Sequence, residues 1–436
     1  MSLRVLFTSM ARRTSSARVP DKSAERKRRG ALRLAILVTL AWVSMTGSQA
    51  GGREIPSSPR DARSNRLVCD GSWKIIESAN VVGTHDDILQ EVAALSSTDT
   101  WAVGYFGFAS GHTFTLAEHW DSQTWSVVAT PNVGSLQNDF MGVHAVSSTD
   151  VWAVGDSVAD SGRYHTLAEH WDGGAWTVVP TPEMVGKSSA LFDVNALADN
   201  DVWAVGQQLS PSNEGTPKIR YRTGALIEHW DGSTWNVVPN PMSGALYATL
   251  QGVAPVTPTD VWAVGTVSDI QHFTSAPLIE HWDGSRWIAF KGPAPHPGNV
   301  LYAVDAVSSD EVWGVGQTGS GPTSYTLVEE WDGSRWRAIG SPNPSSSGNY
   351  LFDVAAVSAD DIWAAGSYLT DSDARLRTLT EHWDGSAWAI VPSPNFGLDP
   401  NELYGVSASA RGDVWAVGKR PDSTGQGALT LTEHYC

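Results

Sequence analysis

Apolar and polar residues alternate in short runs throughout residues 69–436, and turn-forming residues separate the runs. A unit starts with a run such as 191–197 (LFDVNAL) and continues with runs such as 151–155, 166–171 and 176–179. Asp172-Gly173 lies between the last two runs, and prolines follow the final one. Period-two alternation and Asp-Gly between apolar runs are typical of antiparallel hairpins. No segment of this region has helical spacing, so the sequence predicts an all-β fold with four antiparallel strands per unit.

Tryptophan marks the same positions in every unit. The string Trp-Ala-Val-Gly, or a close variant, begins at Trp101, Trp152, Trp203, Trp262, Trp313, Trp363 and Trp415. A second string, commonly Glu-His-Trp-Asp-Gly, contains Trp120, Trp171, Trp230, Trp282, Trp331 and Trp383. A third tryptophan follows five residues later in each unit, and Trp73 has the same context near the N-terminus. We expect the Trp-Ala-Val-Gly tryptophans to fill the space between neighbouring units, because each buries a large apolar area.

Seven units of about fifty residues with four strands each are typical of a β-propeller. An open β-solenoid is the alternative, although its coils are usually shorter. The chain ends favour the propeller, because the seventh unit stops at Cys436, where its fourth strand should begin. A matching strand lies at 69–76 instead. We therefore predict a closed seven-bladed β-propeller whose last blade is completed by the N-terminal strand.

The two cysteines lie at the break in this last hairpin. Cys436 ends the third strand and Cys69 begins the fourth. In an exported protein we expect them to form a disulfide in place of the turn of the other blades. In the chain-entropy model, closing so long a loop contributes up to roughly 5 kcal/mol.

The repeat resembles those of Kelch-type and Asp-box β-propellers and, more distantly, WD-repeat propellers. The segment from Trp282 to Trp287, Trp-Asp-Gly-Ser-x-Trp, is similar to the Asp-box turn, with His281 at the place of the family's serine. The Kelch double glycine is missing. Similar repeats occur in secreted bacterial proteins, so the resemblance implies a bacterial source. It covers residues 69–436 and implies a fold but no activity.

The N-terminal segment has the features of an export signal. Five basic residues lie within 26–33, an apolar run follows at 34–43, and Ser48-Gln49-Ala50 resembles a cleavage site. We predict a signal peptide at 1–50, a linker at 51–66 and the propeller at 67–436, with an uncleaved anchor as the alternative. No other apolar run approaches membrane length. We therefore expect a secreted or cell-envelope protein with no membrane span after cleavage.

The formal net charge is −18, and outside residues 1–50 there are 19 basic and 45 acidic residues. So acidic a surface repels phosphate backbones and argues against nucleic acid as a partner. Glycan or protein ligands remain, and we expect a monomer.

Glu-His pairs recur in six of the units, from Glu118-His119 to Glu433-His434. A group present in nearly every blade is more simply structural than catalytic. We expect each histidine to bind the aspartate of the neighbouring turn, as at Asp99, Asp150, Asp201 and Asp260, a network similar to that of WD-repeat propellers.

Binding residues are expected where the repeats differ, in the connections between second and third strands and between blades. The longest insertion, at 207–224, carries a basic cluster that suits a carboxylate, sulfate or phosphate. The candidate ligand-binding residues are Lys218, Arg220, Tyr221, Arg222, Arg163, Tyr164, Phe106 and Arg375. Plain solvated loops are the other interpretation of these residues.

Four carboxylates occur in the innermost strands: Glu91, Asp193, Asp305 and Asp353. They could coordinate a hydrated Ca²⁺ in the channel, but they follow no common register. We therefore assign no metal site and no cofactor, with calcium as the one candidate, and we assign no catalytic residue.

These features favour a non-catalytic secreted scaffold that binds a glycan, peptide or surface partner through the variable loop face. The alternative is an extracellular polysaccharide hydrolase or lyase, with its acid and base expected near Asp371 and Asp373. A structural cell-envelope protein is a third interpretation, because the fold itself does not select a function.

Overall fold

The computed structural model describes residues 69–211, 221–245, 247–269, 274–293, 295–296, 298–319, 323–397 and 400–436. The predicted signal peptide and linker lie outside these residues. In the described part of the chain every regular element is a β-strand. This part also contains no helix of the length and apolarity needed to cross a membrane.

Five sheets contain four consecutive strands each, paired antiparallel in sequence order. The first two are β6(Gln137–Ser147), β7(Asp150–Val158), β8(Tyr164–Trp171), β9(Trp176–Val178), and β10(Ser188–Ala198), β11(Asp201–Pro211), β12(Tyr221–Trp230), β13(Trp235–Val237). The next two are β14(Ala248–Thr257), β15(Asp260–Asp269), β16(Thr274–Trp282), β17(Trp287–Phe290), and β18(Val300–Ser308), β19(Glu311–Thr318), β20(Tyr325–Trp331), β21(Trp336–Ile339). The fifth is β22(Gly348–Ser358), β23(Asp361–Leu369), β24(Leu376–Trp383), β25(Trp388–Ile390).

The sixth sheet joins the two ends of the described chain. It contains β26(Glu402–Ala410), β27(Asp413–Pro421), β28(Ala428–Tyr435), β2(Asp86–Ser96), β3(Asp99–Gly107), β4(Thr113–Trp120) and β5(Trp125–Val128). The strand β1(Trp73–Ile76) pairs antiparallel with β28, whereas β28 meets β2 at one parallel pair, Asp86 with Ala428. The N-terminal strand therefore lies in the same sheet as the C-terminal strand, as the sequence predicted.

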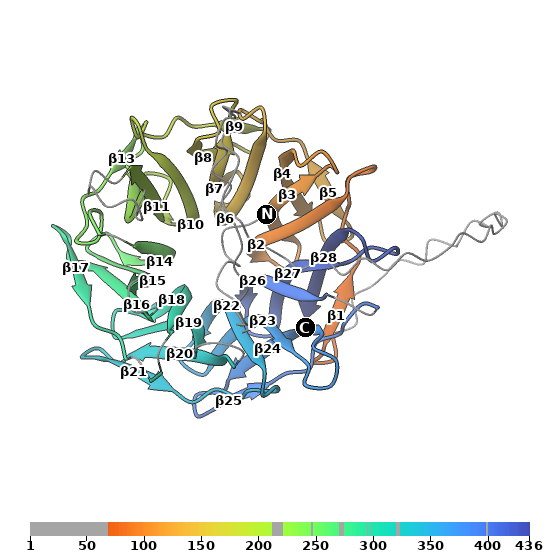
Figure 1. The fold of residues 1–436 in the computed structure, drawn as a ribbon. Coiled ribbons are helices and arrows are strands. Elements are labelled where there is room, and N and C mark those ends of the chain that lie inside the picture. Colours follow the sequence, from red (N-terminus) through yellow and green to blue (C-terminus); the bar gives the residue numbers. More distant parts are fainter. Residues whose placement is uncertain are drawn as a thin grey trace, which may run out of the picture.

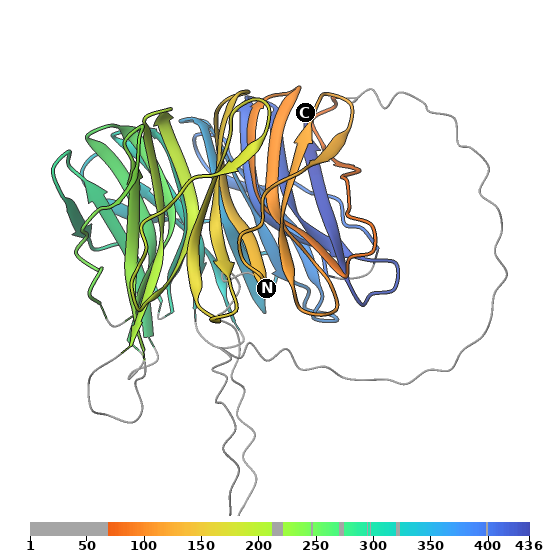
Figure 2. The same ribbon diagram turned by 90° about the horizontal axis from the view of Figure 1, so that it is seen from above.

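The sheets are arranged in a ring with β2, β6, β10, β14, β18, β22 and β26 nearest its centre (Figure 1). Figure 2 shows the ring from the side, with the strands crossing its thickness. This arrangement of repeated four-stranded antiparallel units is a β-propeller, so the predicted all-β propeller architecture is confirmed.

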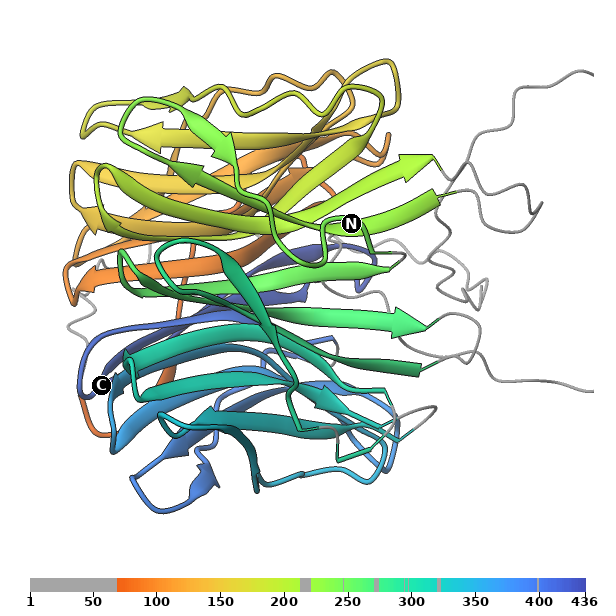
Figure 3. The same cartoon turned by 90° about the vertical axis from the view of Figure 1, so that its left-hand side faces the viewer.

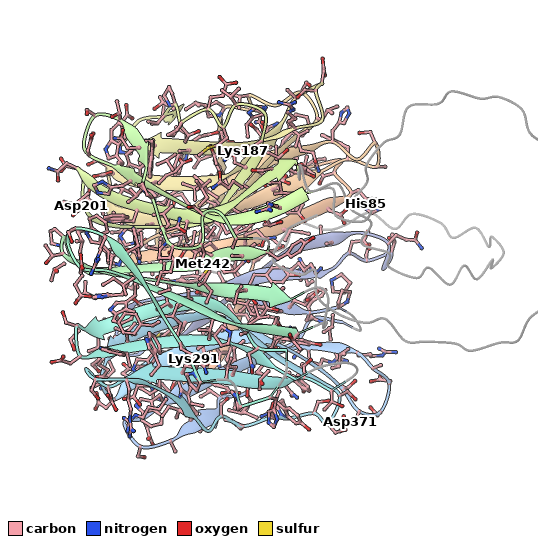
Figure 4. All side chains as sticks on the ribbon, turned by 60° about the vertical axis from the view of Figure 1, so that its left-hand side comes forward. His85, Lys187, Asp201, Met242, Lys291 and Asp371 are labelled. Carbon is pink, nitrogen blue, oxygen red and sulfur yellow. A yellow bond between two sulfur atoms is a disulfide. The ribbon has the colours of Figure 1, made fainter. Side chains whose placement is uncertain are left out.

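The ring has two unlike faces. On the turn face, the first strand of each unit turns into the second and the third into the fourth; on the loop face, the second strand connects to the third and each unit to the next. The C-terminus lies at the turn face (Figure 3). In Figure 4, Asp201 marks the turn face, whereas His85 and Asp371 mark the loop face.

Tryptophans fill the space between neighbouring units, which confirms the prediction made for them. The Trp152 ring lies 5.2 Å from the Trp230 ring and 5.4 Å from the Trp235 ring, both of which belong to the next sheet. Trp101, Trp262, Trp313 and Trp415 are among the largest fully buried side chains. Aromatic pairs of this kind each add about 0.5–1.5 kcal/mol beyond their buried area.

The glycine of Trp-Ala-Val-Gly allows the inner strand to approach. A Cβ atom on Gly155 would lie 1.9 Å from the carbonyl oxygen of Asp139, beside the bulge between Phe140 and Gly142. The same close approach occurs at Gly104, Gly206, Gly265, Gly316, Gly366 and Gly418. Any side chain at this position would separate the first two strands of the unit, so the repeat requires glycine here.

Cys69 and Cys436 form the predicted disulfide, with their Cα atoms 4.6 Å apart and 367 residues apart in sequence. The amide of Gly71 donates to the carbonyl oxygen of Cys436 at 2.7 Å, so the chain ends are joined by both a covalent bond and a hydrogen bond.

Candidate functional site

The recurrent histidines of the turn face are structural, as predicted. In six units the histidine Nε2 atom lies 2.6–2.8 Å from an aspartate of the turn between the first two strands. The pairs are His119–Asp99, His170–Asp150, His229–Asp201, His281–Asp260, His382–Asp361 and His434–Asp413. Each histidine also lies against the Trp-Ala-Val-Gly tryptophan of its own unit, as His229 does against Trp203 at 4.2 Å. Each pair thus links two turns of one sheet.

The predicted ligand-binding residues are distributed over several units at the loop face. Lys218 and Arg220 lie outside the described residues, and Tyr221 is the first residue of β12. Arg222, next along β12, is half-buried. The other residues come from the units of β2–β5, β6–β9 and β22–β25.

The described members of this set contact neighbours within their own units. Phe106 stacks on Phe114 at 5.5 Å, and the Tyr164 hydroxyl donates to Gln137 at 3.4 Å. Arg375 pairs with Asp373 at 2.8 Å, whereas Arg163 is exposed. None of these contacts joins two members of the set, so their joint role in binding stays a prediction.

Asp371 and Asp373 are held in the ionised form. Hydrogen bonds from Ser345 and Ser346 lower the pKa of Asp371, and a hydrogen bond from Thr370 lowers that of Asp373. A general acid requires the opposite shift. These two residues therefore lack the property expected of a hydrolase acid.

A buried carboxyl pair, which the sequence analysis missed, lies in the unit β6–β9. Asp139 and Asp156 face each other across β6 and β7, and both are almost fully buried. Burial raises the pKa of both groups, and the Asp139 charge raises that of Asp156 further. Burial therefore favours the protonated form in this pair. The available signal was Asp156 itself, an acid directly after the repeat glycine.

The corresponding pair of the last unit has opposite charges. Glu402 and Lys419 lie 3.0 Å apart, and the Lys419 ammonium lies 5.6 Å from the centre of the Tyr404 ring. Burial, and after it the Glu402 charge, raises the pKa of Tyr404, so its hydroxyl stays protonated. Tyr404 continues an aromatic row, because Phe352 lies 5.7 Å from it and Tyr302 lies 5.5 Å from Phe352.

The innermost carboxylates connect neighbouring units. Asp193 accepts a hydrogen bond from the amide of Val253 at 2.8 Å, and Asp305 accepts one from Ala356 at 2.8 Å. Asp353 accepts one from Val406 at 2.7 Å. Within the described ranges, no group of three or more His, Cys, Asp or Glu residues is placed to hold a metal ion. Calcium in the channel stays a prediction, and all four of its proposed ligands have a structural partner, since Glu91 accepts a hydrogen bond from the amide of Val92 at 3.1 Å.

Exposed apolar side chains distinguish the two faces. Of the ten large exposed hydrophobic residues described, four lie in the outer strands β5, β9, β13 and β25, and six lie at the loop face. The six are Val82, Phe108, Val133, Val185, Tyr325 and Phe396. The loop face thus carries most of the large exposed apolar side chains described, distributed over several units.

No family model and no curated protein matches the sequence. Among solved structures, the chain is similar to YCF48 bound to D1 peptide, with 13% identity over 83% of this chain and 94% of that chain (TM-score 0.49). YCF48 from Cyanidioschyzon merolae is 14% identical over 84% and 99% (TM-score 0.49). A PL25 ulvan lyase bound to -[GlcA(1-4)Rha3S]- is 10% identical over 80% and 94% (TM-score 0.48). The propeller assignment rests on the strand pairing of this chain itself.

Proposed function

We propose that this protein is an exported, closed seven-bladed propeller that binds a polypeptide partner through its loop face without catalysis. The eight-stranded sheet supports this blade count, because it can be divided at its single β28–β2 pair into β2–β5 and β26–β28 with β1. The Cys69–Cys436 bond supports closure by β1 and also supports export, because disulfides persist in oxidising compartments.

The exposed apolar residues of the loop face carry the proposal. Val82 is 96% exposed and Val185 is 84% exposed, both in connections between units. A valine side chain has no flat face for stacking on a sugar ring, whereas it packs well against apolar side chains of a polypeptide. Phe396 lies 4.2 Å below the Arg420 guanidinium and adds an aromatic anchor with a positive charge beside it. Aromatic and arginine anchors are typical of protein interfaces.

The test is selection from a phage-displayed random peptide library on the full chain. We expect enrichment of peptides with apolar residues, and at least about tenfold weaker binding after the double substitution Phe108→Ser and Phe396→Ser. The matched control is Val127→Ser with Val237→Ser, which removes exposed apolar side chains from outer strands instead. The proposal fails if no peptide is enriched, or if both double variants lose binding equally.

The buried pair Asp139–Asp156 favours a second candidate, a polysaccharide hydrolase. A carboxyl group kept protonated by burial beside a second carboxyl group is a property of acid–base sites. Reducing-sugar release from a panel of polysaccharides should then be detectable and should disappear in Asp156→Asn. If the Asp139→Asn and Asp156→Asn variants release sugar at the rate of the unmodified protein, this candidate is removed.

A further inference from the structure

A cleft opens on the turn face between the units β6–β9 and β10–β13, on the side opposite to the proposed polypeptide surface. Its volume is about 590 Å³, within the usual size range of small-molecule sites. The residues that line it include Asp150, Trp152, His170, Asp172, Asp199 and Trp230.

Two tryptophans form the apolar part of the cleft. Trp152 is 2% exposed, and its ring lies 5.2 Å from the half-buried Trp230 ring. The indole N–H of Trp152 has no acceptor among the described residues, although Trp203 and Trp363 donate to Asp201 and Asp361 at 2.9 Å. This N–H is itself buried, and the equivalent indole N–H groups of Trp101, Trp262 and Trp415 likewise have no acceptor among the described residues, so it is a feature of the repeat and not of the cleft.

The turn that borders the cleft departs from the repeat. In five other turns a serine hydroxyl donates to the turn aspartate at 2.5–2.6 Å: Ser72, Ser233, Ser285, Ser334 and Ser386. Here Gly174 replaces that serine, and Asp172 accepts only the backbone amides of Gly174 and Ala175. These amides lower the pKa of Asp172, so the group is a carboxylate with acceptor capacity that those five turns use internally, and Asp121 is the one other turn aspartate bound by backbone amides alone among the described residues.

A second departure lies on the opposite wall. In other units, the tryptophan at the position of Trp230 donates its N–H to the carbonyl oxygen of Ser97, Ser148, Pro258, Ser309 or Ala359. In this unit Trp230 donates its N–H to the carbonyl oxygen of Asp199 at 3.1 Å. The Asp199 side chain is exposed. Asp150, bound to His170 at 2.8 Å through one oxygen, is the third carboxylate of the cleft.

We propose that this cleft binds the ring of a neutral saccharide. Sugar hydroxyls donate hydrogen bonds, so one ring can donate to both Asp172 and Asp199. The indole of Trp230 offers an apolar face to the ring. A simple cation would satisfy the carboxylates but leave the apolar face of Trp230 uncovered, and anionic sugars are repelled by three carboxylates. The proposal is independent of the polypeptide site on the other face.

The test uses the full chain on an array of neutral oligosaccharides, followed by calorimetric titration with the free sugar that binds. Gly174→Ser restores the serine of the five other turns. The new side chain fits, because the nearest atom to a Cβ at this position is the Asp172 carboxylate oxygen at 3.4 Å. We expect this variant to keep the melting temperature and to bind at least about tenfold more weakly, since one charge-assisted hydrogen bond is lost. Asp199→Ser should act in the same direction.

The matched control is Asp310→Ser, which removes an exposed acid from the turn face of a different unit and should leave binding unchanged. The proposal is overturned if no neutral saccharide on the array binds, or if only charged glycans bind. It is equally overturned if Gly174→Ser and Asp199→Ser bind the sugar as the unmodified protein does.

Discussion

In each His–Asp pair, the histidine stabilises the fold through contacts with two neighbouring side chains. His281 bonds Asp260 at 2.7 Å, and its ring lies 4.2 Å from that of Trp262. The imidazole therefore fixes a turn and covers a core tryptophan at the same time. In the unit β18–β21 the histidine is replaced by Glu330, which pairs with Arg337 on the next strand at 3.1 Å. The position thus tolerates another polar side chain when a new partner is supplied.

We predict that His281→Ala lowers the free energy of unfolding by about 1–3 kcal/mol, because it removes the bond to Asp260 and part of the cover of Trp262. Urea unfolding followed by circular dichroism measures this difference. His112→Ala, at an exposed loop position, is the control and should change stability little. Equal stability of the two variants would contradict the structural role of the pair.

At the scale of the element, the short strand β1 is held in place by more than its pairing with β28. Four residue pairs join it to β28, and Trp73 is 4% exposed, with its ring 5.6 Å from that of Trp363. Four pairs alone hold a terminal strand weakly, since chain ends fray readily. The disulfide and the buried tryptophan therefore determine whether the edge of β28 stays covered.

We predict that replacing both Cys69 and Cys436 by serine lowers the free energy of unfolding by up to roughly 5 kcal/mol. Limited proteolysis should cut the N-terminal segment of this variant before any other site, because β1 is released first. Adding a reductant to the unmodified protein should reproduce the same loss. Unchanged unfolding and proteolysis in the variant would show that packing of β1 is sufficient.

At the scale of the whole molecule, each unit contains a glutamate with no exposed surface. They are Glu118, Glu169, Glu228, Glu280, Glu329, Glu381 and Glu433. Burial raises the pKa to about 8 for Glu169, Glu228, Glu329 and Glu381, and to about 7 for Glu280. Burial also raises the pKa of Glu118 and Glu433 well above the ordinary value. For Glu228, burial is the sole cause, with no charged neighbour contributing.

These glutamates make the ring sensitive to alkali. Above the ordinary glutamate pKa the unfolded chain releases protons that the folded protein retains, so the free energy of unfolding falls as pH rises. For Glu228 the fall extends from about pH 4.5 to about pH 8, where the folded group also ionises. The effect is absent below the ordinary pKa, because the group is then protonated in both states.

We predict that the melting temperature falls between pH 5 and pH 8 and that Glu228→Gln reduces this slope, because one group contributes up to about 1.4 kcal/mol per pH unit. Thermal unfolding at several pH values measures the slope. Glu183→Gln changes an exposed glutamate and is the control. Parallel pH profiles of Glu228→Gln and the unmodified protein would show that Glu228 does not titrate in this range.

Much of the fold could be predicted from the sequence, because its determinants are local. Alternating apolar residues, Asp-Gly turns and the spacing of Trp-Ala-Val-Gly specify strands and turns within a single unit. The Cys69–Cys436 pairing could be predicted because a missing strand at one end matched a surplus strand at the other. Even the His–Asp pairs follow from two turns that share one face of the ring.

The candidate sites depended on contacts that no local pattern encodes. Asp139 and Asp156 face each other because the bulge after Phe140 sets the pairing of β6 with β7. Asp172 and Asp199 belong to different units, and they line one cleft because two sheets pack with their turns side by side. Strand number and order were thus determined by the sequence itself, through short-range alternation. Which polar groups are buried, paired or left with acceptor capacity was decided by the tertiary structure, because register and sheet packing set those distances.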